Sequence, residues 1–219
     1  MNNAVILDFM GVVANLDYVQ LALDLPLNEK FKAFRVALKL LKTPELKKAL
    51  QDYQAGKITQ NNLINVFSKY CQNASIIVPK LLKKIAQYVF INYDVLKYAE
   101  IIRSKGVKVY ILSNTIPETE HIIKTIDLNR YFDDVVFSTE VKMTKPNPNI
   151  YNYMISKYNL SPRQTLFLDD SKKNLIGAER LGISSIQSSN PEETCDILDC
   201  YLSYLEMPKT TFSEKTNLL

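Results

Sequence analysis

Short apolar runs alternate with segments of helical periodicity along much of the chain. The runs are rich in Val, Ile and Leu and are bounded by polar residues or glycine; they cover residues 4–7, 107–112, 135–137, 165–168 and 183–186. Runs of this length and composition predict strands that are buried on both faces of a sheet. Helical spacing follows at 95–105 and 116–126. We therefore expect an α/β fold, with a parallel sheet between two layers of helices.

Residues 16–93 follow a different pattern, because they contain several amphipathic helical repeats and no convincing strand. Helix starts are predicted at Thr43-Pro44, where a capping residue precedes a proline at the first helical position, and at Thr59. Pro79 predicts the start of another helix. Together with a helix upstream of Thr43, these segments indicate a small all-helical insertion, or cap.

The helix upstream of Thr43 carries an apolar stripe. Phe31, Phe34, Leu38 and Leu41 share one face of this helix. We expect the stripe to pack inside the cap, because apolar residues at helical spacing form protein cores more often than they form cofactor sites.

These patterns divide the chain into a core, from residues 1–15 and 94–206, and a helical cap from residues 16–93. Residues 207–219 are polar and lack periodicity, so we expect a flexible tail. The total of 219 residues suits one domain with a substantial insertion.

Composition and charge narrow the class of protein. Hydrophobic residues make up 47% and charged residues 23%, as in ordinary globular proteins. The net charge of +4 is spread without a block of like charges, so we expect no nucleic-acid partner. No apolar run reaches about 18 residues and no signal peptide is evident, so we expect a cytoplasmic protein with no membrane partner. The three cysteines do not suggest a disulfide framework, and the oligomeric state is left open.

Three of the predicted strands end directly in reactive polar side chains: Asp8, then Ser113 and Asn114, then Asp169 and Asp170. Each alone is an ordinary cap or turn residue, but the carboxyl ends of parallel strands form the ligand site of an open sheet. Carboxylates that meet there repel one another unless a cation lies between them, and hard oxygen ligands suit Mg²⁺. The sequence therefore predicts a magnesium site.

Lys145, which precedes Pro146, is the candidate cation of the same site. A phosphate ester needs its negative oxygens neutralised before an anionic nucleophile can approach, and a lysine with Mg²⁺ can do this. A residue before proline avoids the helical conformation, so we expect Lys145 at a loop with Pro146 helping to start the next helix. The alternative is an ordinary surface lysine.

These segments, in this order, resemble the motifs of the haloacid dehalogenase-like superfamily, most of whose members are phosphatases. The residues that carry the resemblance are Asp8-Phe9-Met10-Gly11-Val12-Val13, Leu112-Ser113-Asn114, Lys145-Pro146 and the run 168–182. The last run is the most specific, and the resemblance covers nearly the whole chain. It implies a three-layer, Rossmann-like α/β/α core with a helical cap between the first and second motifs.

The resemblance also implies roles for individual residues. Asp8 would attack phosphorus and form an aspartyl-phosphate, which divides one hard displacement into two easier ones. Asp8, the backbone carbonyl of Met10 and Asp170 would bind Mg²⁺, with Asp169 nearby.

The remaining motif residues would bind the phosphoryl group. Ser113 and Asn114 would contact phosphate oxygens, and Lys145 would balance the charge of Asp8 and of the substrate. The implied substrate is a small phosphorylated metabolite.

Met10 departs from the family pattern. Phosphatases of this type usually carry a second aspartate at this position, which protonates the leaving group and later activates water. A thioether cannot transfer a proton, and a positioned acid or base contributes about 10²- to 10⁴-fold. One alternative is therefore a catalytically weakened or non-catalytic binding or regulatory protein. A dehalogenase or phosphonatase is a further alternative, although the Asp169-Asp170 pair argues against metal-free dehalogenation.

Overall fold

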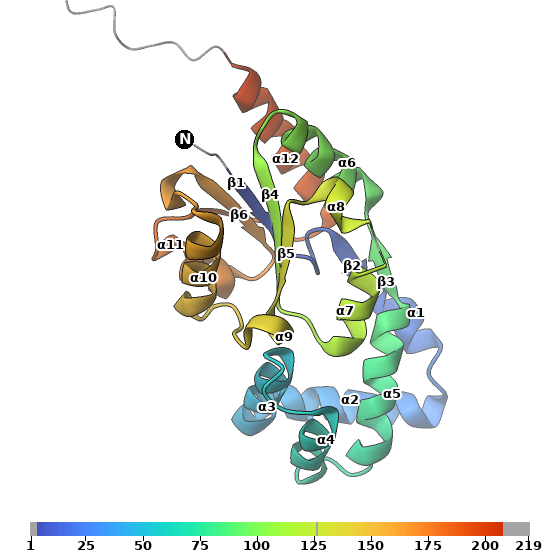
Figure 1. Cartoon of the computed structure of the whole chain (residues 1–219). Helices are drawn as coiled ribbons and strands as arrows, with labels where there is room; N and C mark the ends of the chain where they lie inside the picture. Colours follow the sequence, from blue (N-terminus) through green and yellow to red (C-terminus); the bar gives the residue numbers. More distant parts are fainter. Residues whose placement is uncertain (1–3, 126, 208–219) are drawn as a thin grey trace, which may run out of the picture.

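The computed structural model describes residues 4–125 and 127–207, and it contains the predicted parallel sheet (Figure 1). The strand order is β5-β4-β1-β6-β7. The strands are β1 (Ala4–Leu7), β4 (Lys108–Ser113), β5 (Asp134–Phe137), β6 (Thr165–Asp169) and β7 (Ser184–Gln187). All the strands expected from the apolar runs are therefore confirmed, and so is the α/β fold class.

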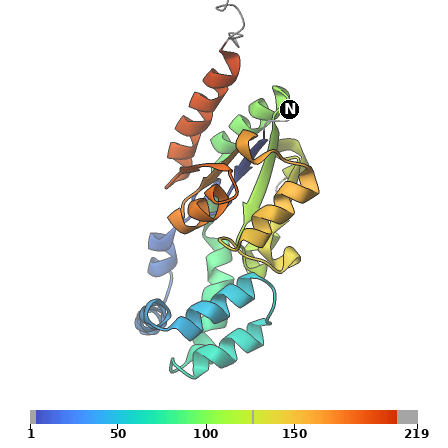
Figure 2. The same cartoon turned by 90° about the vertical axis from the view of Figure 1, so that its left-hand side faces the viewer.

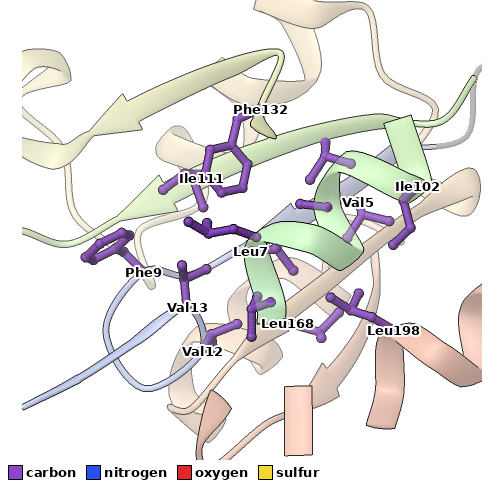
Figure 3. Close-up of a cluster of buried hydrophobic side chains, with 14 of the residues drawn as sticks. Val5, Leu7, Phe9, Val12, Val13, Ile102, Ile111, Phe132, Leu168 and Leu198 are labelled. Carbon is purple, nitrogen blue, oxygen red and sulfur yellow. The ribbon is translucent and has the colours of Figure 1, made fainter. Parts of the chain in front are cut away.

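Helices cover both faces of the sheet, and the alternation of side chains along β1 explains why. Val5 and Leu7 pack with α6 (Tyr93–Ser104) and α12 (Pro191–Glu206) in one buried cluster (Figure 3). Ile6 points to the opposite face and packs with α10 (Pro148–Tyr158) and α11 (Lys172–Glu179). Because successive side chains of a strand point to opposite faces, a continuous apolar run needs a helical layer on each side.

The register of the sheet determines which residues meet at its carboxyl end. Strand β1 lies between β4 and β6, and Leu7 is paired with Ile111 on one side and Leu168 on the other. Asp8 and Asp169 each follow directly after this level. Of the shorter elements, α7 (Pro117–Ile123) and α9 (Ser138–Val141) follow β4 and β5 at this carboxyl end, whereas α8 (Leu128–Tyr131) and the 3₁₀ turn η1 (Pro162–Gln164) precede β5 and β6 at the opposite end.

Residues 18–87 form helices with their own buried cluster, which lies below the sheet in Figure 1, and we refer to this segment as the cap. They are α2 (Leu27–Lys42), α3 (Pro44–Gln54), α4 (Gln60–Ser68) and α5 (Ala74–Gln87), preceded by the short α1 (Tyr18–Leu23). The predicted start of α4 is confirmed, because the Thr59 side chain accepts a hydrogen bond from the backbone of Asn62. The predicted start at Pro79 is wrong. Helix α5 begins five residues earlier, since that extra turn buries Ala74, Ile77 and Val78.

The insertion contains a strand that its sequence pattern did not show. Strand β3 (Val89–Ile91) pairs antiparallel with β2 (Ala14–Leu16), at the two connections between cap and core. Each strand has three residues, which is too short for a recognisable alternation, and the partner lies more than 70 residues away in the chain. Only tertiary pairing defines this ribbon.

The expected packing of the apolar stripe on α2 is also wrong. Phe31 is 65% exposed, Phe34 61% and Leu41 68%. The bundle instead buries Val36, with Ala33 and Leu40 partly buried beside it. Helix α2 has two apolar faces, and its neighbours pack against the one with the smaller side chains.

The predicted tail at 207–219 lies outside the described residues except for Met207, which is exposed. Among the residues that the structure describes, no helix is long and apolar enough to cross a bilayer.

Candidate active site

The strand-end residues form one cluster at the carboxyl edge of the sheet. Asp8, Ser113 and Asp169 are buried there, and Asp170 lies closer to solvent. Asp8, Asp169 and Asp170 each offer a carboxylate oxygen, and these oxygens lie within 4.8 Å of one another. Residues that are more than 150 positions apart in the chain therefore meet because β1 and β6 are adjacent and parallel.

Lys145 enters this cluster from the loop that precedes α10, and only 2% of its surface is exposed. Its Nζ donates to Asp8 Oδ1 at 2.8 Å, to Asp169 Oδ2 at 2.7 Å and to the Leu112 carbonyl oxygen at 2.7 Å. An ammonium group has three protons, so each of them has an acceptor. The alternative of a surface lysine is excluded. Helix α10 starts at Pro148 with Asn147 as its cap, two residues later than the expected start at Pro146.

Asn114 holds the backbone of Lys145. Its amide nitrogen donates to the Lys145 carbonyl oxygen at 2.9 Å, and its carbonyl oxygen accepts from the Lys145 backbone N–H at 2.8 Å. This pair of hydrogen bonds aligns the lysine and leaves one amide hydrogen of Asn114 for a ligand. The family resemblance implies only a phosphate contact for Asn114, because nothing in the sequence spacing links positions 114 and 145.

Ser113 presents an unused hydroxyl group. Its Oγ is buried and makes no hydrogen bond within the described part of the chain. Most buried hydroxyl groups in proteins are hydrogen-bonded, so an unpaired one at a ligand site indicates a polar group that is supplied by the ligand. This position beside the carboxylate cluster is where a phosphate oxygen is expected.

Asp169 is satisfied by the protein itself. Besides Lys145, it accepts from the backbone N–H of Ser171 at 2.8 Å and from the Asn174 side-chain amide at 2.9 Å. Asp169 therefore anchors Lys145 and the start of α11, which leaves Asp8 and Asp170 as the more available carboxylates. Asn174 was part of the recognised motif, but its contact with Asp169 was not foreseen.

Gly11 allows the first and fourth motif segments to touch. A Cβ atom placed on Gly11 would lie 2.9 Å from the Cβ, Cγ and Oδ2 atoms of Asp170, and the Gly11 φ angle is +86°. Any side chain there would displace the Asp170 carboxylate and strain the backbone. The sequence shows the glycine, but only the fold shows what it makes room for.

The charges in the cluster do not balance without a cation, because three carboxylates face one ammonium group. Burial raises the pKa of Asp8 to about 8; Lys145 opposes this rise, and Asp169 and Asp170 add to it. Burial and the neighbouring Asp169 also raise the pKa of Asp170. For Lys145, burial alone would lower the pKa, but the attraction of Asp8 and Asp169 outweighs it and raises the pKa. The hard oxygen donors and the excess of negative charge both fit a divalent cation such as Mg²⁺.

Met10 lies in the turn after Asp8, which is closed by a hydrogen bond from the Val13 N–H to the Phe9 carbonyl oxygen at 2.9 Å. Its side chain is half-buried and packs against the core cluster that contains Phe9 and Val13. The thioether therefore serves packing and offers no proton. His121 is the chain's one histidine, and it is exposed on α7.

The cap reaches the core close to the second motif. Tyr53 Oη on α3 and Gln60 Nε2 on α4 both donate to Glu118 Oε1 on α7, at 2.7 and 2.9 Å. Nearby, Ser138 Oγ donates to the Gln54 carbonyl oxygen at 2.6 Å. These contacts were not foreseen, because nothing in the sequence indicated which cap helix faces the core.

Known proteins resemble this chain in sequence. The sequence model of the haloacid dehalogenase-like hydrolases matches residues 10–187, starting two residues after Asp8. A phosphorylated carbohydrate phosphatase of Thermotoga maritima is 33% identical over 97 residues, covering 43% of this chain and 44% of the relative. A D-ribitol-5-phosphate phosphatase of Bacteroides thetaiotaomicron is 34% identical over 93 residues, covering 39% of this chain and 45% of the relative. The chain thus matches less than half the length of either phosphatase.

A solved structure supports the fold. An enzyme of this family from Bacteroides thetaiotaomicron, determined in complex with magnesium and inorganic phosphate, superimposes with a TM-score of 0.64 at 23% identity. The alignment covers 85% of this chain and 94% of that one. The family sequence model matches most of the chain, and the fold agrees with that of this enzyme. The chain therefore belongs to the haloacid dehalogenase-like hydrolase family.

Proposed function

We propose that this protein is a Mg²⁺-dependent phosphatase that hydrolyses a small phosphorylated metabolite through an aspartyl-phosphate on Asp8. The observation that carries the proposal is the buried Asp8–Lys145–Asp169 chain of ion pairs, with the unpaired Ser113 hydroxyl at the same edge of the sheet. The similarity to two sugar-phosphate phosphatases supports this substrate class.

Asp8 is held ready as a nucleophile. Its Oδ1 accepts from Lys145 Nζ at 2.8 Å and from the Phe9 N–H at 2.6 Å, which fixes the plane of the carboxylate. Its Oδ2 accepts no hydrogen bond from the described residues and remains available to a ligand. A fixed nucleophile lowers the entropic cost of reaching the transition state.

Asp8, Asp170 and the backbone carbonyl of Met10 would hold Mg²⁺. When bound, the ion would cancel the excess negative charge and polarise the phosphoryl group. Lys145 would share the charge of the transferring group, and Ser113 would donate its free hydroxyl to a phosphate oxygen. Asn114 would act mainly by orienting Lys145, with its remaining amide hydrogen directed to phosphate.

Attack by Asp8 forms a bond to phosphorus and breaks the bond to the leaving oxygen, which then needs a proton. Met10 cannot supply that proton, so leaving groups that depart as stable anions should react fastest. Water must then hydrolyse the aspartyl-phosphate without a base at position 10. Both steps are therefore expected to be slower than in relatives with an aspartate there.

The direct test compares the protein with its Asp8→Asn variant on a panel of sugar phosphates and nucleotides with Mg²⁺, following phosphate release. We expect activity in the wild type and none in Asp8→Asn. Asp196→Asn, which changes an exposed carboxylate on α12, is the matched control and should behave as wild type. Equal rates for wild type and Asp8→Asn would refute the proposal.

Met10 favours a second candidate, a protein of this fold that binds a phosphorylated ligand and turns it over weakly or not at all. The variant Met10→Asp separates the two. A gain of about 10²- to 10⁴-fold on alkyl phosphates, smaller on aryl phosphates, would indicate a phosphatase scaffold that lacks one proton donor. Ligand binding with no gain in turnover would indicate a binding protein.

A further inference from the structure

One face of α2 is apolar although it is exposed. It carries large apolar side chains at alternating spacings of four and three residues: Leu27, Phe31, Phe34, Leu38 and Leu41. That spacing aligns them along one side of the helix, and they are between 37% and 70% exposed. Contiguous apolar surface of this kind usually marks an interaction site.

Helix α1 also carries exposed apolar side chains. Tyr18, Val19 and Leu23 are 62% to 72% exposed on it. Figure 2 shows α1 and α2, both in blue, along the same side of the molecule. Exposed apolar side chains therefore lie on two successive helices on this side of the molecule, and a broad occupant has more of them to contact than a single partner helix has.

A row of cations runs beside the apolar stripe. Lys32, Arg35, Lys39 and Lys42 make no ion pair or hydrogen bond in the part of the chain that is described. They line one wall of a cavity of about 540 Å³, opposite the loop between α4 and α5. No acidic residue lines this cavity, and none of the residues of the candidate active site does.

We propose that α2 docks the protein on an anionic phospholipid membrane. The stripe enters the boundary between headgroups and acyl chains, and the cations beside it bind headgroup phosphates. A helix with an apolar face and a basic flank has the features of one that lies in the plane of a membrane surface. This proposal departs from the expectation of no membrane partner, which rested on the absence of a long apolar run and of a signal peptide; docking requires neither.

The positive charge beside the stripe favours an anionic membrane over a second copy of the chain as the partner of α2. Two copies of α2 packed antiparallel through their stripes would bring the flanks that carry Arg35 and Lys42 together, and like charges oppose such contact. An anionic lipid surface instead complements these cations. An acidic amphipathic helix would also complement them, but a single helix on α2 makes no use of the exposed apolar side chains of α1.

The test is flotation of the full-length chain with vesicles of phosphatidylcholine alone and with vesicles that also contain phosphatidylserine. We expect the protein to bind only the anionic vesicles, and salt to weaken the binding. Phe31→Gln combined with Phe34→Gln, and separately Arg35→Gln combined with Lys39→Gln, should each weaken binding by about tenfold or more. All four side chains are exposed or line an open cavity, so the fold should tolerate these changes.

Control variants outside α2 test whether the loss of vesicle binding is specific to this helix. Lys47→Gln combined with Lys83→Gln removes two exposed cations from α3 and α5 that have no ionic partner among the described residues, and Tyr204→Gln removes an exposed ring from α12. These variants should bind anionic vesicles as the wild type does. Circular dichroism should show every variant folded, and phosphate release from a soluble substrate should be unchanged in all of them.

Several results would overturn the proposal. They are equal binding to both kinds of vesicle, no binding to either, or binding that the α2 variants leave intact. Dimerisation that the phenylalanine variants abolish, without vesicle binding, would assign the surface to a second copy. Preferential binding of an acidic amphipathic peptide would assign it to a protein partner, and equally tight binding of soluble glycerophosphoserine would assign it to a free anion.

Discussion

Two groups of cations on this molecule show how burial changes what a side chain can do. Lys145 lies inside the core, and each of its ammonium protons has an acceptor. Lys39 and Arg35 lie on the cap without an ionic partner among the described residues. The buried group is held in one geometry, as a reaction centre requires. The exposed group keeps its charge available for an external partner.

The buried lysine and the exposed cations also differ in how much their removal should affect the protein. Removing one member of a buried ion pair leaves an uncompensated charge in a poorly solvated site, whereas an exposed charge is screened by water. Changes in the core site should therefore cost stability as well as activity. Changes on α2 should cost only binding.

The largest expected effect is that of Lys145→Met. This variant leaves Asp8 and Asp169 without their cation and should lower the free energy of unfolding by about 3–5 kcal/mol in magnesium-free buffer. Urea denaturation measures this change. Lys39→Met on the cap is the control and should shift stability by no more than about 0.5 kcal/mol. Similar losses in both variants would erase the distinction between the two cation groups.

Metal binding should depend on pH at the core site and lipid binding should not. Because the pKa of Asp8 is raised to about 8, Mg²⁺ must displace a proton at lower pH. We expect magnesium affinity to fall by about tenfold for each pH unit below 8 and to level off above it. Titration calorimetry in buffers of different ionisation enthalpy measures both the affinity and the released proton.

Vesicle binding through α2 provides the contrast, because no carboxylate lines its basic cavity. It should stay constant between pH 6 and pH 9. A magnesium affinity that is independent of pH would mean that Asp8 is already ionised in the metal-free protein.

Gly11→Ala should separate backbone strain from damage to the site. Both Gly11 and Gly106 have a positive φ angle, but a Cβ atom on Gly106 would meet no atom within 4 Å. Each substitution to Ala should therefore cost about 1–2 kcal/mol of stability through strain. Gly11→Ala alone should also weaken magnesium binding, because its Cβ displaces Asp170. Equal magnesium affinity in both variants would show that Asp170 does not depend on this contact.

The smallest expected effect is that of Tyr53→Phe at the contact between cap and core. The variant removes one of the two hydrogen bonds to Glu118 Oε1 and leaves the other, from Gln60. We expect a loss of about 1 kcal/mol in thermal or chemical unfolding. Vesicle binding should not change, since Tyr53 is buried and is not part of the exposed stripe on α2. A change in vesicle binding would mean that the two cap surfaces are coupled.

Local patterns were sufficient to predict much of the core. The strands at 4–7 and 165–168 follow from continuous apolar runs, and Asp8 and Asp169 follow from their positions directly after those strands. Thr59 was predictable as a cap because capping involves residues only three positions apart. Such features depend on neighbours along the chain, which a sequence displays directly.

Other features depend on segments that are distant in sequence, and these were decided by the tertiary structure. Asn114 supports Lys145 across 31 positions, and Gly11 makes room for Asp170 across more than 150. Neither partner can be read from spacing, because both contacts arise from strand order in the sheet.

The apolar stripe on α2 illustrates the same division most directly. The sequence determined that α2 would be a helix with Phe31 and Phe34 on one face, since helical periodicity is a local property. It did not determine which face would be buried, because α2 has apolar residues on two faces. The packing of α3 and α5 against Val36 made that choice, and it left the larger side chains exposed to solvent.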